Sequence, residues 1–156
     1  MSVVTPAQLA KYMKARSNVL IMAGYQCDEM ELDGKKLSDY AAEVALKLNA
    51  PVAATGNSVV ALKAKGAKAT KKIAVELVEM LRYADWRDPI ISQRPEAVVF
   101  IGYPKGIAIG LVVAARDVDT VVLGADEVSE ATYSLGDTSL RKYQQNLDRL
   151  LKALAA

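Results

Sequence analysis

The sequence contains no histidine and only one cysteine, Cys27, among its 156 residues. Without histidine there is no Ser-His-Asp or Cys-His catalytic group, no zinc-protease helix and no iron site built from two histidines and a carboxylate. One thiol can hold neither an iron–sulfur cluster nor an internal disulfide. We therefore expect no metal site and no catalytic residue in this chain, and nothing in its cysteine content demands an oxidising compartment.

Charge of one sign is not in excess either, since 20 basic and 18 acidic side chains give a net charge of +2. This balance argues against nucleic-acid binding, which usually needs a basic excess, and gives no hint of a membrane surface. No apolar run approaches 18 residues, and the N-terminus lacks the basic start and long apolar stretch of a signal peptide. We expect a soluble cytoplasmic protein with a single domain over residues 1–156.

Four short, continuous apolar runs alternate with segments of helical periodicity. Such runs are typical of strands that are buried on both faces of a parallel sheet. They span residues 18–24, 51–54, 97–102 and 120–124. The clearest helical spacing falls over residues 35–49, 104–115 and 140–154. The alternation predicts an α/β fold, a Rossmann-like three-layer domain with a mainly parallel sheet and helices on both faces.

Glycines and small polar residues gather where the predicted strands end, and ligands of open parallel sheets bind beyond these ends. The candidate cofactor-binding residues are Gly24, Thr55, Gly56, Asn57, Ser58, Gly102 and Gly124. Glycine lets the backbone approach a ligand closely, and the helix start after Gly56 offers N–H groups to a phosphate. The alternative is that these glycines only make the tight strand-to-helix turns of the fold.

The known nucleotide fingerprints are missing. The first strand is followed by residues 24–27 (GYQC) rather than by a GxGxxG motif, and Thr55 stands where an acidic residue would bind a ribose. No GxxxxGK[ST] motif occurs, which excludes a P-loop ATPase. Gly102, Gly106 and Gly110 are spaced by four and leave a smooth helix face. We expect that face to pack against the sheet, with a ligand or a partner helix as the alternative.

Two further features have both a structural and a functional interpretation. Cys27 follows the first strand in what reads as a polar loop, beside two carboxylates that raise a thiol pKa, so we expect it to be unreactive. Trp86 lies in the longest irregular segment, residues 83–96. A tryptophan in a polar loop either anchors an interface or packs the loop onto its own domain. The five lysines within residues 63–72 are expected to form a solvated helix junction rather than a docking patch.

Several segments resemble one known family when they are taken together and in order. They are residues 18–24, 50–58, 85–86, 98–103 and 131–136. In these segments the chain resembles the epsilon subunit of archaeal carbon monoxide dehydrogenase, which is also a subunit of the acetyl-CoA decarbonylase/synthase complex. The resemblance covers nearly the whole chain.

The resemblance implies a fold like the deoxyhypusine synthase-type NAD/FAD-binding domain. It implies a large nickel–iron–sulfur catalytic subunit as the partner, in an α2ε2 hetero-oligomer, with Trp86 and Arg87 as candidate partner-binding residues. The small subunit would then be an accessory, non-catalytic one that stabilises the catalytic subunit or assists electron transfer to a flavin. No tightly bound cofactor is expected, and FAD or another nucleotide is the candidate for weaker binding. The alternative function is a stand-alone FAD/NAD-binding electron-transfer module.

Overall fold

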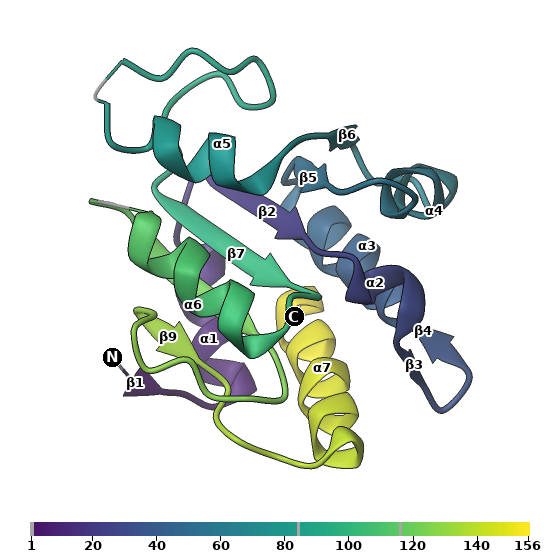
Figure 1. Cartoon of the computed structure of the whole chain (residues 1–156). Helices are drawn as coiled ribbons and strands as arrows, with labels where there is room; N and C mark the ends of the chain where they lie inside the picture. Colours follow the sequence, from purple (N-terminus) through teal and green to yellow (C-terminus); the bar gives the residue numbers. More distant parts are fainter. Residues whose placement is uncertain (1, 84, 116) are drawn as a thin grey trace.

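The computed structural model describes residues 2–83, 85–115 and 117–156, and in this part of the chain seven strands form one parallel sheet (Figure 1). Across the sheet they lie in the order β1 (Ser2–Val3), β9 (Tyr133–Ser134), β8 (Asp119–Leu123), β7 (Ala97–Ile101), β2 (Val19–Ala23), β5 (Val52–Ala54) and β6 (Ala69–Lys71). Each neighbouring pair is parallel. The central strands β2 and β7 are buried at every position, as their continuous apolar sequences predict.

Helices cover both faces of this sheet. One face carries α1 (Pro6–Lys14), α3 (Leu37–Leu48), α4 (Ser58–Ala64) and α7 (Leu140–Ala155), and the other carries α5 (Ala74–Met80) and α6 (Lys105–Ala114). A short helix, α2 (Gln26–Glu29), follows β2 and leads into an antiparallel hairpin of β3 (Glu31–Leu32) and β4 (Lys35–Lys36).

Successive side chains of β2 point to opposite faces and build two separate cores. Ile21 packs under the α1, α3 and α7 layer, whereas Leu20 and Met22 pack under α5 and α6. The arrangement confirms the predicted Rossmann-like three-layer fold. Among the described residues, none of the helices combines the length and the apolar character needed to cross a membrane.

The glycines of α6 lie on its outer surface, contrary to the expectation from the sequence that they pack against the sheet. Gly106 and Gly110 are exposed, and a Cβ atom built on either would meet no other atom within 4 Å. The side of α6 that faces the sheet is formed by Ala108, Leu111 and Val112 instead. The expectation that these glycines pack against the sheet is therefore wrong for Gly106 and Gly110, which leave an open face, whereas Gly102 is buried at the end of β7.

Candidate functional site

The order of the strands reverses between β2 and β7, because the chain builds β5 and β6 on one side of β2 and later β7, β8 and β9 on the other. Rossmann-like folds bind ligands at this switch point, in the crevice beyond the carboxyl ends of the two strands. Gly24 follows β2 and Gly102 follows β7 at this edge.

The crevice is filled by the protein's own atoms. The Gly24 N–H donates to the Ile101 carbonyl at 2.8 Å, and the Gln26 N–H donates to the Gly102 carbonyl at 3.0 Å. A Cβ on Gly24 would lie 2.5 Å from the Gly102 oxygen and 2.6 Å from Cδ1 of Tyr103. At Gly24 the space that the missing side chain leaves is thus occupied by the Gly102 carbonyl and the Tyr103 ring.

Cys27 closes the same crevice from the α2 side. The sequence suggests a polar loop, but Cys27 lies within α2, has 0% of its surface exposed and points its thiol toward the Ile101 carbonyl at 3.7 Å. Burial, with a smaller contribution from the charge of Asp28, raises the pKa of the thiol to about 12. The shift has the direction expected from the neighbouring carboxylates, although burial is its larger cause.

A cavity of about 240 Å³ opens beside the closed crevice, over the carboxyl ends of β7 and β8. Its lining includes Gln26, Gly102, Tyr103, Lys105, Gly124 and Asp126. Two of the predicted cofactor-binding residues, Gly102 and Gly124, are therefore brought together, while Gly24 lies outside this lining. The volume is below the roughly 300–1,000 Å³ of pockets for drug-sized ligands.

The polar groups of the cavity suit a small anionic or hydrogen-bonding ligand. Tyr103 lines the cavity, and its hydroxyl is buried without a hydrogen-bond partner; burial raises its pKa further above neutral pH. Lys105 brings a positive charge at the first turn of α6, where helix N–H groups also favour an anion. Tyr143 also lines the cavity and uses its hydroxyl to donate to the Leu123 carbonyl at 2.8 Å.

Every clearly shifted pKa among the described residues is raised. The described side chains with a clearly shifted pKa are Tyr12, Arg16, Cys27, Tyr40, Tyr103 and Tyr143, and each shift is upward. An upward shift takes a phenol or thiol further from neutral pH, where a general acid or base works best. In the same part of the chain, no group of three or more potential ligand side chains is placed to bind a metal ion.

The remaining predicted cofactor-binding residues lie at the end of β5, outside the lining of the cavity. Gly56 has φ +40°, and a Cβ there would meet nothing within 4 Å, so this glycine serves the turn rather than a close contact. Thr55 accepts a hydrogen bond from the Ser58 N–H at 3.0 Å through its carbonyl. Asn57 precedes α4 without a capping hydrogen bond from its side chain, and the Ser58 hydroxyl is buried without a partner. Their role in binding stays a prediction.

Trp86 is tied to its own domain. Its indole N–H donates to the carbonyls of Asp88 at 2.9 Å and Ile91 at 3.0 Å, and the half-buried ring packs against the core under α5 and α6. The Asp88 carboxylate also pairs with the Lys72 ammonium at 2.9 Å. The structure therefore favours loop packing over a free interface anchor for Trp86.

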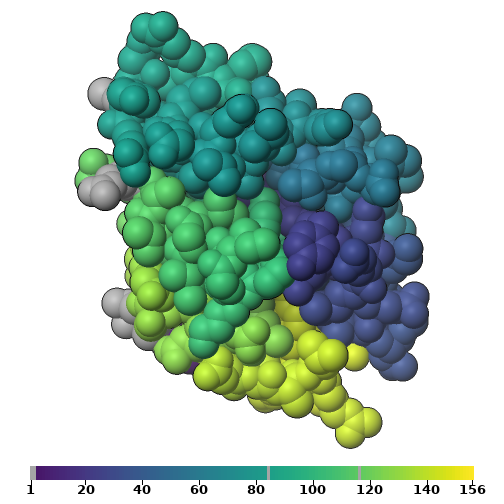
Figure 2. All heavy atoms as spheres, viewed as in Figure 1, coloured from purple at the N-terminus to yellow at the C-terminus, as the bar shows by residue number. Residues whose placement is uncertain are grey.

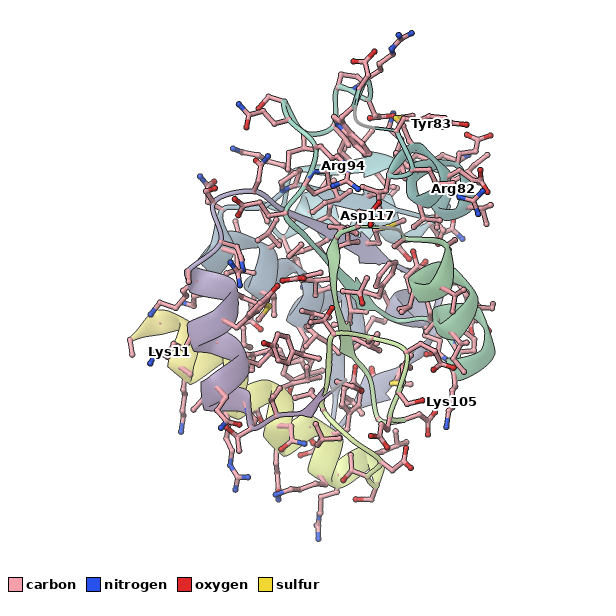
Figure 3. All side chains as sticks on the ribbon, turned by 90° about the vertical axis from the view of Figure 1, so that its left-hand side faces the viewer. Lys11, Arg82, Tyr83, Arg94, Lys105 and Asp117 are labelled. Atoms are coloured by element: carbon pink, nitrogen blue, oxygen red, sulfur yellow. The ribbon has the colours of Figure 1, made fainter. Side chains whose placement is uncertain are left out.

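Arg87 faces solvent instead. Its guanidinium pairs with the exposed Asp85 carboxylate at 2.7 Å beside a shallow, mostly apolar hollow that Met80 and Tyr83 also line. Figure 3 shows Tyr83 and Arg82 at the end of α5, on the same outer corner of the molecule. Ala84, which belongs to the predicted irregular segment, lies outside the described residues.

Sequence reasoning did not single out Tyr103, Lys105 or Asp126 as site residues. A lysine at the start of the helix that follows a strand-ending glycine is a signal for an anion site that could have found Lys105. Nothing in the sequence shows that Tyr103 covers Gly24, because that contact joins residues almost eighty positions apart.

These features define the class of the protein, a Rossmann-like α/β domain with a closed switch point and a small cavity beside it. The chain is 27% identical over 154 residues to the acetyl-CoA decarbonylase/synthase complex subunit epsilon 1 of Methanosarcina barkeri (strain Fusaro / DSM 804), a match that covers 97% of this chain and 88% of the relative. No family model matches the chain. The similarity to the epsilon subunit that the sequence motifs predict is confirmed by this relative.

Proposed function

We propose that this protein is an accessory, non-catalytic epsilon subunit of the carbon monoxide dehydrogenase component of an acetyl-CoA decarbonylase/synthase complex. The observation that carries the proposal is the match along 97% of the chain to a relative named as a subunit of that complex. The upward pKa shifts of Cys27, Tyr103 and Tyr143 support a non-catalytic role for these three buried groups, because the shifts take them further from neutral pH.

In this proposal the partner is a large nickel–iron–sulfur catalytic subunit, which the small subunit stabilises in an α2ε2 assembly. The surface that we assign to the contact is the hollow formed by Met80, Tyr83 and Arg87. Tyr83 is 63% exposed, and tyrosine and arginine are enriched among residues that dominate binding energy at interfaces. In this proposal Trp86 does not touch the partner. Its indole hydrogen bonds fix the conformation of the loop that carries Arg87.

The contact is tested by measuring association of the purified chain with the purified large subunit under anaerobic conditions. Tyr83→Ala and Arg87→Ala are each expected to weaken association by about tenfold or more, the loss typical of a hot-spot residue. Arg149→Ala, at another exposed arginine on α7, is the matched control and should bind as the unmodified chain does. Equal binding by all three variants would show that the hollow is not the contact.

A second candidate function is the binding of a nucleotide through its phosphate end at the strand-end cavity. The observation that favours it is that Tyr103, whose buried hydroxyl has no hydrogen-bond partner, and the positively charged Lys105 line the same cavity. A nucleotide-binding site is needed if the subunit assists electron transfer to a flavin. It is needed equally if the chain is a stand-alone electron-transfer module. We therefore place the phosphate of the ligand, rather than a whole FAD, in this cavity.

Calorimetric titration with FAD, NAD and AMP tests the site. Gly124→Leu fills the cavity without backbone strain, because a Cβ there has only ordinary contacts of 3.7 Å and longer. This variant should abolish binding, whereas Gly56→Ala, outside the cavity, should leave it unchanged. If Gly56→Ala lost binding and Gly124→Leu kept it, the ligand would sit at the end of β5 instead.

A further inference from the structure

Positive charge is concentrated on the first long helix of the chain and on the last. Residues 6–16 and 140–156, which contain α1 and α7, carry seven basic side chains and one acidic one, whereas the rest of the chain carries 13 basic and 17 acidic ones. The two helices contact each other and bury their apolar sides in the same core, so their charged sides share one outer surface. Figure 2 shows α7, in yellow, uncovered at the bottom of the molecule, and Figure 3 shows Lys11 of α1 on the outer surface.

Five basic side chains of this surface are exposed, and none of them forms an ion pair with another residue of the described chain. We call them the α7 basic face, and they are Lys11, Arg141, Lys142, Arg149 and Lys152. The other two basic residues of the helices are engaged. Arg16 pairs with the Asp119 carboxylate at 3.9 Å, and the Lys14 ammonium donates to the Ala156 carbonyl.

Acidic side chains lie at the margins of the α7 basic face. Asp148 accepts a hydrogen bond from the Tyr40 hydroxyl at 2.9 Å, so its carboxylate is turned toward α3. Glu31 belongs to β3, which contacts α7, and Asp137 precedes the helix, where its carboxylate accepts a hydrogen bond from the Glu127 N–H at 2.6 Å. These carboxylates border the face but leave its five cations without a partner in the chain.

Helix stability explains only part of this positive charge. A cation in the last turn of a helix is stabilised by the helix dipole, whereas a cation in the first turn is destabilised by it. Lys11 and Lys152 lie in the last turns of α1 and α7. Arg141 and Lys142 lie in the first turn of α7, which contains no acidic residue. The charge at the start of α7 therefore costs the helix stability, and binding of an anionic partner accounts for it.

A short acidic segment fits this surface better than an extended polyanion. The acidic excess of the rest of the chain would repel a nucleic-acid duplex or an anionic membrane that reached beyond the face. The apolar side of α7, with Tyr143 and Leu147, is buried and does not insert into lipid or stack on a base. From Arg141 to Lys152 the face extends about 16 Å along α7, and an acidic helix presents carboxylates at the same intervals of three and four residues.

We propose that the α7 basic face binds an acidic helix of a partner protein through complementary charge. In the proposed function the large subunit contacts the hollow formed by Met80, Tyr83 and Arg87 at the end of α5, so the acidic helix belongs to a different partner. The inference therefore does not depend on the proposed function.

Fluorescence anisotropy of a labelled peptide, titrated with the purified full chain, tests the proposal. The probe is an alanine-rich helical peptide of about twenty residues with glutamate at every fourth position, and its control has the same composition with all glutamates at one end. The face variant combines Arg141→Glu, Lys142→Glu and Arg149→Glu. The matched control variant combines Lys63→Glu, Lys68→Glu and Lys71→Glu, which reverse the same number of exposed, unpaired charges near β6, at the far edge of the sheet.

At about 150 mM salt, the face variant should raise the Kd of the probe by about tenfold or more, and the control variant by less than about twofold. The face variant should also unfold at an equal or higher temperature, because glutamate in the first turn favours the helix. Its loss of binding is then not a loss of folding.

Equal losses by the two variants would show that binding follows net charge alone and would overturn the proposal, as would an unmodified chain that does not bind the probe. Equal affinity for the two peptides would overturn the helical spacing. Tighter binding to phosphatidylserine vesicles or to a DNA duplex than to the probe would overturn the class of partner.

Discussion

The sulfur of Cys27 occupies the space that a side chain at position 102 would need, because a Cβ built on Gly102 lies 2.5 Å from Sγ. Cys27 lies in α2, which follows β2, and Gly102 directly follows β7, so both come after the strands that flank the switch point of the sheet. Their contact closes the crevice in which Rossmann-like folds usually bind a nucleotide. Beside this contact, a cavity opens over the carboxyl ends of β7 and β8.

Gly102→Ala should therefore be strongly destabilising. The new methyl group overpacks the Cys27 contact, which costs about 1–3 kcal/mol, and φ +85° adds about 1–2 kcal/mol of backbone strain. Gly34→Ala is the matched control, since φ is +81° there and a Cβ meets nothing within 4 Å. Urea unfolding should show a clearly larger loss of unfolding free energy at position 102. Equal losses would mean that the thiol moves away at no cost.

The two tyrosines of the cavity should respond oppositely to removal of their hydroxyl groups. Tyr103→Phe removes a buried hydroxyl that has no partner, so the free energy of unfolding at pH 7 should stay the same or rise by about 1 kcal/mol. Tyr143→Phe leaves the buried Leu123 carbonyl without its donor and should cost about 1–3 kcal/mol. Thermal or urea unfolding measures both. A loss at position 103 equal to that at position 143 would show that the Tyr103 hydroxyl has a partner after all.

Stability should fall at alkaline pH. In the folded state the pKa of Cys27 is raised to about 12, so the folded thiol keeps its proton while the unfolded thiol loses it above about pH 8.5. The unfolded state then binds fewer protons, and the free energy of unfolding decreases as pH rises from about 9 toward 12. The raised pKa values of Tyr103 and Tyr143 act in the same direction above about pH 10. Urea titrations at pH 7, 9 and 10.5 check the sign, and constant stability over this range would contradict it.

Reactivity of the same thiol gives an independent check. A thiol reagent at pH 8 should modify Cys27 only slowly in the folded protein and at once in urea, because the folded sulfur is both buried and protonated. Fast labelling of the folded chain would show that α2 opens readily from the switch point.

The irregular segment around Trp86 should separate stability from binding. Trp86→Phe removes an indole N–H with two carbonyl acceptors and should lower the free energy of unfolding by about 1–2 kcal/mol. Arg87→Ala removes only an ion pair between exposed side chains, so its effect on stability should stay within about 0.5 kcal/mol. Urea unfolding measures both variants. If Arg87→Ala destabilised the chain as much as Trp86→Phe, its effect on partner binding could not be assigned to the contact itself.

The central strands were predictable because their apolar runs are long and continuous. The predicted segments 18–24, 97–102 and 120–124 correspond to β2, β7 and β8 within one residue at each end. The edge strands β1 and β6, and β9 beside β1, are two or three residues long, so no periodicity can develop in them and only pairing in the folded sheet defines them.

The site was less predictable than the strands. Glycines at strand ends mark close approaches, but the sequence cannot say whether a ligand or the chain itself makes them, as Gly102 and Cys27 illustrate. The sequence also indicated the wrong side of α6 for Gly106 and Gly110, which face the solvent rather than the sheet. Because α6 is apolar on all sides, its sequence carries no polar positions that show which side faces the solvent.

The central claim is that this chain is an accessory subunit of a much larger metalloprotein. An anaerobic pull-down of the tagged chain from its native extract, read by mass spectrometry and visible absorbance, tests it most directly. The account predicts a co-eluting large catalytic subunit, identified by its peptides, together with brown iron–sulfur absorbance. A bare 16.8 kDa chain, whether colourless or yellow with flavin, would contradict it.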